Sequence, residues 1–237
     1  MLDLVVFLGN PGREYERNRH NAAWLFAECL PFSASLLWRE KFKGFYACLE
    51  SGLVDGYSSA GGPVGESPPA VPESEAAHGG PPRKPPSRKL HFLKPKTFMN
   101  VSGEAAAAAA AFFKIAAESI LVVHDELELP LGTVSLKRGG GLGGHNGLRS
   151  MKLSLGTADF WRFRFGIGRP DDRAPGQGGA PGSGKGIVDW VLSDFSAAEE
   201  AVLDRVFALA VDAFTAALTG EPAALLPAWG KRPLADF

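Results

Sequence analysis

The chain has 237 residues, of which 45% are hydrophobic and 22% are charged. This apolar content is enough for one sizeable core, and the length alone permits one or two domains. The formal net charge of −1 excludes a globally basic nucleic-acid binder, so any RNA contact must come from a local patch.

The N-terminus and the cysteines indicate the compartment. The chain starts with a strand-like run at residues 2–8 and lacks the basic region, long apolar region and small-residue cleavage site of a secretory signal. Its apolar stretches fall short of the ~18 residues that a membrane span needs. Cys29 and Cys48 have neither metal nor redox spacing, and we expect both to be buried or half-buried thiols. We therefore expect a cytoplasmic protein without membrane contact.

Strand and helix signals alternate along the chain. Short apolar runs and period-two alternation predict strands, and helical periodicity with end signals predicts helices. The expected strands are residues 2–8, 45–49, 90–93, 120–124, 134–137 and 161–168, and the expected helices are residues 21–30, 102–114, 146–155 and 196–218. This alternation favours an α/β fold with a partly parallel sheet, in which ligands gather at the carboxyl ends of the strands.

Local signals mark several helix ends and faces. Ser102 is expected to cap the second helix, Gly156 to end the third, and Ser196 to form a capping box with Glu199. The apolar faces are expected to include Trp24, Leu25 and Cys29 in the first helix and Val202, Val206, Leu209 and Phe214 in the last.

Two segments differ in composition from the rest. More than half of residues 55–88 and of residues 170–186 are Gly, Pro or Ser. Such segments bury too little apolar surface to offset their ordering entropy, so we expect flexible insertions in one domain that spans residues 1–237. Residues 83–96 carry basic and no acidic side chains. This run is either a solvated linker, which its composition favours, or an RNA contact.

Polar residues follow the predicted strands. Asn10 lies in a Gly-Asn-Pro-Gly turn after the first strand, and Asp125 follows the strand at residues 120–124. His20 lies at the start of a predicted helix, where a histidine is more often a cap or a solvated side chain than a catalytic base. A buried carboxylate that fixes the tautomer of an imidazole makes the ring a competent base, so His20 and Asp125 are a candidate pair.

Two further stretches resemble ligand sites. The glycine-rich residues 139–147 lack the Walker and Rossmann patterns, but they allow close approach of backbone to a ligand. Alternation places Arg162 and Arg164 on one face of a strand, as a solvated face or as a phosphate clamp with Lys137 as a possible partner. A metal site from His20, His124 and His145 lacks ligand spacing and is not expected.

Six motifs occur in the order and approximate spacing of the bacterial peptidyl-tRNA hydrolases, which this chain resembles. They are Gly9-Asn10-Pro11-Gly12, Arg19-His20-Asn21, Thr97-Phe98-Met99-Asn100-Val101-Ser102-Gly103, His124-Asp125-Glu126-Leu127, Gly143-Gly144-His145-Asn146-Gly147 and Arg162-Phe163-Arg164-Phe165-Gly166-Ile167-Gly168. The resemblance covers residues 1–51 and about 89–218. It implies a compact monomeric α/β domain with a twisted mixed sheet flanked by helices.

The resemblance also implies a reaction, hydrolysis of the ester between peptide and tRNA, which recycles tRNA. By position in the matching motifs, His20 is the expected general base, Asp125 the carboxylate that orients it, and Asn10 a third catalytic residue. Asn100 and Asn146 match asparagines that hold the peptide with Asn10. Water and one positioned base suffice for an activated ester, so no metal or cofactor is expected.

The expected partner is peptidyl-tRNA, bound by its acceptor end and its 3′ peptide ester. Lys137 and Arg164 match the pair that grips the terminal 5′ phosphate, a contact by charge rather than base sequence. Further substrate or tRNA contacts are expected from Tyr15, Phe98, Met99 and His145. Two positions depart from the family: Ala23 replaces a frequent glycine, and Ser135 replaces a second lysine of some relatives, which weakens the expected positive patch.

Two alternatives remain. A non-catalytic RNA-binding relative would not need the pair of His20 and Asp125 together with three asparagines. An unrelated α/β esterase would need a nucleophile elbow, and the sequence contains no Gly-x-Ser-x-Gly.

Overall fold

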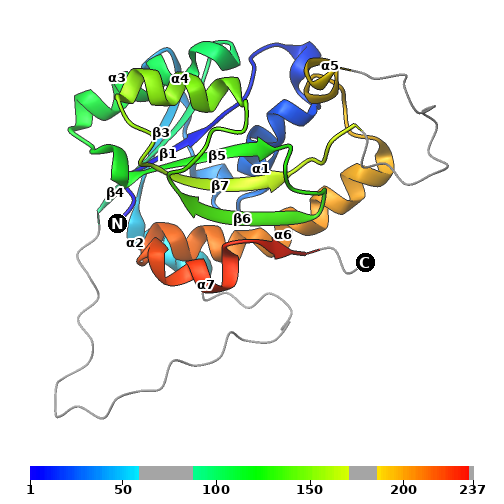
Figure 1. Cartoon of the computed structure of the whole chain (residues 1–237). Helices are drawn as coiled ribbons and strands as arrows, with labels where there is room; N and C mark the ends of the chain where they lie inside the picture. The colour runs from blue at the N-terminus through cyan, green and yellow to red at the C-terminus, as the bar shows by residue number, and fades with distance from the viewer. Residues whose placement is uncertain (59–87, 171–185, 235–237) are drawn as a thin grey trace, which may run out of the picture.

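The computed structural model describes residues 1–58, 88–170 and 186–234. The strands are β1 (Leu4–Phe7), β2 (Arg39–Lys41), β3 (Gly44–Glu50), β4 (Lys89–Pro95), β5 (Ile120–Glu126), β6 (Thr133–Arg138), β7 (Trp161–Gly166) and β8 (Arg232–Pro233). The α-helices are α1 (Ala22–Cys29), α2 (Ser51–Ser58), α3 (Ser102–Phe113), α4 (Asn146–Leu155), α5 (Ile187–Val191), α6 (Ala197–Thr219) and α7 (Leu226–Trp229) (Figure 1).

Within the described residues the strands form one mixed sheet in the order β2-β3-β4-β1-β5-β7-β6-β8. The central strands β4, β1, β5 and β7 run parallel, and the outer strands are antiparallel. Every residue of β1 is buried, as expected for a central parallel strand that is covered on both faces. The α/β class with a partly parallel sheet and flanking helices is therefore confirmed.

Two helical layers cover the sheet. Helices α3 and α4 lie over one face and pack on Leu4 and Val6, while α1, α2 and α6 lie over the other and pack on Val5 and Phe7 (Figure 1). Phe26 of α1 lies at the centre of the second layer and contacts four other phenylalanine rings. The alternation along β1 thus divides its side chains between the two cores.

The expected end signals of α4 and α6 are confirmed. Helix α4 has the expected bounds, and Gly156 ends it in the left-handed conformation with φ 75°. Ser196 and Glu199 form the reciprocal capping box at the start of α6. No described helix is long and apolar enough to cross a membrane.

Three side-chain expectations are wrong. Val101, not Ser102, precedes α3, because a 3₁₀ turn (Met99–Val101) leads into the helix and the Ser102 hydroxyl donates back to the carbonyl of Phe98. Cys29 is exposed, since Phe26 and its alanine neighbours form the buried face of α1. Leu209 is also exposed, because the buried face of α6 runs through Val206, Ala210 and Phe214.

Structure extends into the first expected insertion. Helix α2 continues to Ser58, past the expected start at residue 55, because Val54 is buried in the core and Tyr57 contacts the ring of Phe32. Arg88 at the other end bonds the carbonyl of Leu2 and the carboxylate of Asp3. Residues 59–87 and 171–185 lie outside the described part. Strands β2 and β8 and helices α2, α5 and α7 were not expected. The two strands and helices α5 and α7 are too short for a periodic signal, and α2 overlaps the segment whose composition predicted an insertion.

Candidate active site

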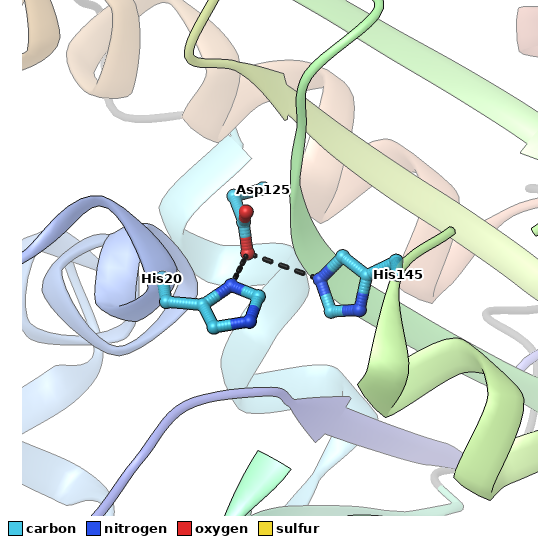
Figure 2. A group of neighbouring side chains, drawn as sticks. All are labelled: His20, Asp125 and His145. Atoms are coloured by element: carbon cyan, nitrogen blue, oxygen red, sulfur yellow. Dashed lines mark hydrogen bonds and ion pairs between the residues drawn. The ribbon is translucent and has the colours of Figure 1, made fainter. Parts of the chain in front are cut away.

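Three side chains from distant parts of the sequence meet near the carboxyl end of β5. His20 lies in a 3₁₀ turn (Arg19–Asn21) before α1, Asp125 in β5, and His145 directly before α4. The same oxygen of Asp125, Oδ1, lies 2.9 Å from Nδ1 of His20 and 3.1 Å from Nε2 of His145. Figure 2 shows both rings pointing at this carboxylate. The structure therefore brings together the expected base and its orienting carboxylate, with a second imidazole beside them.

Burial and charge define the chemistry of this group. Asp125 is 1% exposed; burial alone would raise its pKa, but His20 and His145 hold the pKa well below its usual range. Burial would likewise lower the pKa of His20, yet the charge and hydrogen bond of Asp125 outweigh it and the pKa is raised. The carboxylate therefore stays ionised and favours an imidazole that accepts a proton.

The histidine next to Asp125 is buried and neutral. His124 is completely buried, and burial, followed by the nearby His145, lowers its pKa well below the ordinary value. Its Nδ1 lies 2.6 Å from the backbone carbonyl of Asp125, so this nitrogen carries the ring proton. His124 is therefore a neutral packing residue, and it does not join the group as a metal ligand.

The hydrogen bonds of His145 decide whether the group suits a metal. One ligand atom each of His20, Asp125 and His145 lie within 4.8 Å of one another. However, Nδ1 of His145 accepts from the backbone N–H groups of Gly147 and Leu148, so the ring proton lies on Nε2 and points at Asp125. Metal binding through Nε2 would move that proton to Nδ1, against two N–H donors. The arrangement therefore fits a proton-bearing group better than a metal centre.

Asn21 holds Asn10 in place, a role that the sequence did not reveal. The Oδ1 of Asn21 accepts from the backbone N–H of Asn10 at 2.7 Å, and its Nδ2 donates to the carbonyl of Asn10 at 3.0 Å. The Oδ1 of Asn10 accepts in turn from the backbone N–H of Met99 at 2.8 Å. Among the described residues no acceptor takes the Nδ2 hydrogens of Asn10. This bond fixes the orientation of the amide and leaves its Nδ2 hydrogens available as donors.

The other expected substrate residues differ in exposure. Phe98 is 60% exposed, and Asn100 and Asn146 are exposed at the first turns of their helical segments. Met99 is buried, and Tyr15 is half-buried in the turn Arg13–Tyr15. The Phe98–Asn100 segment reaches the centre through the bond between Met99 and Asn10.

The glycine-rich loop has a structural anchor. Gly143 and Gly144 have φ values of 58° and 74°, which other residues rarely adopt. Arg162 is 1% exposed, and its guanidinium donates to the carbonyls of Gly140 and Gly141. Arg162 is thus neither a solvated side chain nor a free phosphate ligand, because it holds the loop that leads to His145.

Lys137 and Arg164 lie on the same face of the sheet. Lys137 pairs with Arg162 across β6 and β7, so Lys137 and Arg164 are diagonal neighbours on one face, roughly 7–8 Å apart with somewhat closer Cβ atoms. Arg164 donates to Glu126 at 3.2 Å and to the hydroxyl of Ser135 at 2.6 Å. Lys137 is half-buried and has no carboxylate partner among the described residues. Ser135 is thus a support for Arg164 rather than a positive charge.

The described part of the basic run is mostly paired. Lys94 is buried and lies 3.4 Å from Glu28, and Lys96 lies 2.6 Å from Glu40. Residues 83–87 lie outside the described part, and the choice between a solvated linker and an RNA contact stays a prediction.

Comparisons with known proteins identify relatives of the whole chain. Residues 4–58 and 74–231 match the family described as peptidyl-tRNA hydrolase. The peptidyl-tRNA hydrolase of Treponema pallidum is 43% identical over 98% of this chain and 96% of its own length. That of Neisseria gonorrhoeae is 37% identical over 93% of this chain and 92% of its own length.

Solved structures that resemble this chain are also peptidyl-tRNA hydrolases. A crystal structure of peptidyl-tRNA hydrolase with N-propanol has a TM-score of 0.70 and 28% identity, and it covers 95% of this chain and 93% of its own. The enzyme from Acinetobacter baumannii has a TM-score of 0.65 and 28% identity, over 96% of this chain and 91% of its own.

Proposed function

Since this chain belongs to the peptidyl-tRNA hydrolase family, we propose that it releases tRNA from peptidyl-tRNA with His20 as the base that activates water. It is a hydrolase, as its relatives are. The observation that supports the proposed mechanism is the bond of 2.9 Å between Nδ1 of His20 and the buried carboxylate of Asp125. This bond places the ring proton on Nδ1 and leaves Nε2 as the basic nitrogen.

The proposed reaction has two proton transfers. Nε2 of His20 takes a proton from water while the water oxygen attacks the ester carbonyl carbon. The tetrahedral intermediate then collapses, the bond to the 3′ oxygen of tRNA breaks, and that oxygen receives the proton from His20. The products are tRNA and a peptide carboxylic acid, which loses its remaining proton to solvent and becomes the carboxylate. Asp125 stays ionised and stabilises the imidazolium that forms between the two transfers.

Amide groups next to this pair are proposed to hold the ester. The Nδ2 of Asn10 is oriented to donate to the peptide or to the developing oxyanion, a contribution of roughly 3 kcal/mol for one such donor. Asn100 and Asn146 are proposed to hold the peptide main chain from the two neighbouring turns, with Tyr15, Phe98 and Met99 as further contacts. Hydrogen bonds to main chain tolerate any peptide sequence.

Lys137 and Arg164 are proposed to bind the 5′ phosphate of the acceptor end. Their diagonal positions on one face supply two cationic groups to a single phosphate. Arg164 must exchange its bond to Glu126 for the phosphate, whereas Lys137 has no such competitor among the described residues. We also propose that the enzyme acts as a monomer, since one chain supplies His20, Asp125 and His145, and that it works in the cytoplasm, where peptidyl-tRNA is formed.

The test uses an N-acetylated aminoacyl-tRNA and measures release of free tRNA. We expect release by the native chain and a loss of roughly 10²–10⁴-fold in His20→Ala, with binding of substrate retained. An aryl ester serves as the control substrate. Binding without release by the native chain would show an RNA-binding protein instead, and cleavage of the aryl ester alone would show a general esterase.

A further inference from the structure

We propose that His145 is a positioning residue, which orients Asp125 through a fixed tautomer and moderates the basicity of His20. This inference rests on the proposed function and changes the role of His145 from a substrate contact to a residue that acts through Asp125. The first observation is that both ring nitrogens bond within the protein. Nε2 bonds Asp125 at 3.1 Å, and Nδ1 bonds the backbone of α4. A substrate therefore has neither ring nitrogen to contact.

The tautomer of His145 is set by the start of α4. Its Nδ1 accepts from the N–H groups of Gly147 at 3.1 Å and Leu148 at 3.4 Å, so the imidazole takes the place of the usual Ser, Thr, Asp or Asn cap. These donors require a lone pair on Nδ1, and the ring proton must lie on Nε2. The start of α4 therefore fixes the direction in which His145 donates to Asp125.

Close packing fixes the position of that helix end. A Cβ on Gly147 would lie 2.5 Å from Sδ of Met99 and 2.8 Å from a methyl of Leu8. Glycine thus lets the first turn of α4 sit against the turn that contains Met99, whose N–H is held by Asn10. The orientation of the His145 ring therefore depends on the turn that contains Met99, which also holds the side chain of Asn10.

A single oxygen serves both imidazoles. Oδ1 of Asp125 accepts from His20 and from His145, whose ring centroids are 4.9 Å apart. The hydrogen bonds from His20 and His145 hold the carboxylate of Asp125 in one orientation. The negative charge of Asp125 then interacts with both rings and not with His20 alone. The bond from His145 thus keeps Asp125 aimed at His20 while it reduces the stabilisation that Asp125 gives to a protonated His20.

In the described part of the chain, titratable groups face His20 from two segments. Asp125 faces it from β5 and His145 from the loop before α4. His124 lies behind His145 with ring centroids 5.0 Å apart, and its lowered pKa keeps it neutral. Arg19, the preceding residue, points to Glu199 of α6. Changes at His145 should therefore reach His20 chiefly through Asp125.

Two variants separate the two bonds of His145. In His145→Asn, the amide oxygen replaces Nδ1 as the cap of α4, but the side chain is too short to reach Asp125. In His145→Gln, the amide nitrogen lies near the position of Nε2 and can still donate to Asp125, but the cap is lost. NMR titration of His20 in the ligand-free protein, together with kcat and KM for an N-acetylated aminoacyl-tRNA, is measured for both.

We expect the pKa of His20 to rise in His145→Asn and to stay near the native value in His145→Gln. His145→Asn should lower kcat roughly tenfold, the loss that corresponds to one hydrogen bond to a charged group, with KM nearly unchanged. His145→Gln should retain most of kcat and lower the melting temperature, because α4 loses its cap.

The opposite pattern would overturn the proposal. A raised KM in both variants with an unaltered titration of His20 would show that His145 contacts substrate instead. Failure of the native chain to release tRNA would refute the proposed reaction, while the titration of His20 in the ligand-free protein would still report on Asp125 and His145. The two failures are therefore distinguishable.

Discussion

The group around Asp125 and the basic face of β6 and β7, which is formed by Lys137 and Arg164, are both polar. They differ in how their charges are compensated. At the centre, Asp125 accepts from two histidines and Asn21 fixes the backbone of Asn10. On the basic face, Arg164 is held by Glu126, an internal anion in the place that we propose for the phosphate. The centre is thus organised before any ligand arrives, whereas the basic face must exchange one partner for another.

The largest expected effect comes from removing the central charge. Asp125→Asn keeps an oxygen that can accept from His20 and His145 but removes the charge that stabilises an imidazolium. We expect kcat to fall by roughly 10²–10⁴-fold with KM little changed, measured by release of tRNA. A loss below threefold would show that the geometry of the centre, and not its charge, supports the reaction.

The same variant should change the pH dependence. The base acts in its neutral form, so kcat/KM of the native enzyme should rise with pH through the pKa of His20, which Asp125 raises above the ordinary value near 6.5. Without that charge, burial of His20 prevails and lowers the pKa. The acid limb of the profile should therefore move to lower pH in Asp125→Asn, and a move to higher pH would contradict this assignment.

Substitution of Asn21 tests whether Asn10 is held in position before substrate binds. Asn21→Ala leaves the N–H and the carbonyl of buried Asn10 without their partners, at a cost of roughly 1–3 kcal/mol in the free energy of unfolding for each group. We expect a lower denaturant midpoint and roughly a tenfold loss of kcat, since Asn10 no longer points its amide at the ester. Normal kcat in a destabilised protein would mean that substrate alone can order Asn10.

The sequence predicted the strands and helices that bear long apolar patterns, and through its motifs it located His20, Asp125 and Asn10. It did not predict the function of Asn21, because a residue at a helix start gives no sign of a contact with the backbone of Asn10. The cap formed by His145 was equally hidden, since histidine is seldom a cap. Arg162 and Arg164 share a face as expected, but only tertiary contacts distinguish the loop anchor from the possible phosphate ligand.

Substitution of Lys137, which has no carboxylate partner among the described residues, tests the other half of the basic face. Lys137→Ala should raise KM about tenfold with kcat unchanged, and it should reduce the slope of log KM against log salt by about one. Arg138→Ala is the matched control, because Arg138 is the next residue of β6 and pairs with exposed Asp159. Equal effects of the two variants would show a diffuse attraction instead of a phosphate contact.

Substitution of Glu126 should give the smallest change in KM. The direction of that change tests most directly whether the basic face is less preorganised than the group around Asp125. Glu126→Gln keeps an oxygen for the backbone N–H of Glu128 but removes the anion that holds Arg164. The side chains of Arg164 and Glu126 are only 14% and 11% exposed, so the cost of desolvating both charges offsets much of their attraction. If a phosphate must displace Glu126, KM should therefore fall by only roughly 2–5-fold, and the gain should shrink at high salt. Glu128→Gln makes the same charge change two residues away, at an exposed pair with Arg169, and should leave KM unchanged. A rise of KM in Glu126→Gln would instead mean that Glu126 orients Arg164 for the phosphate, and that the basic face is as preorganised as the centre.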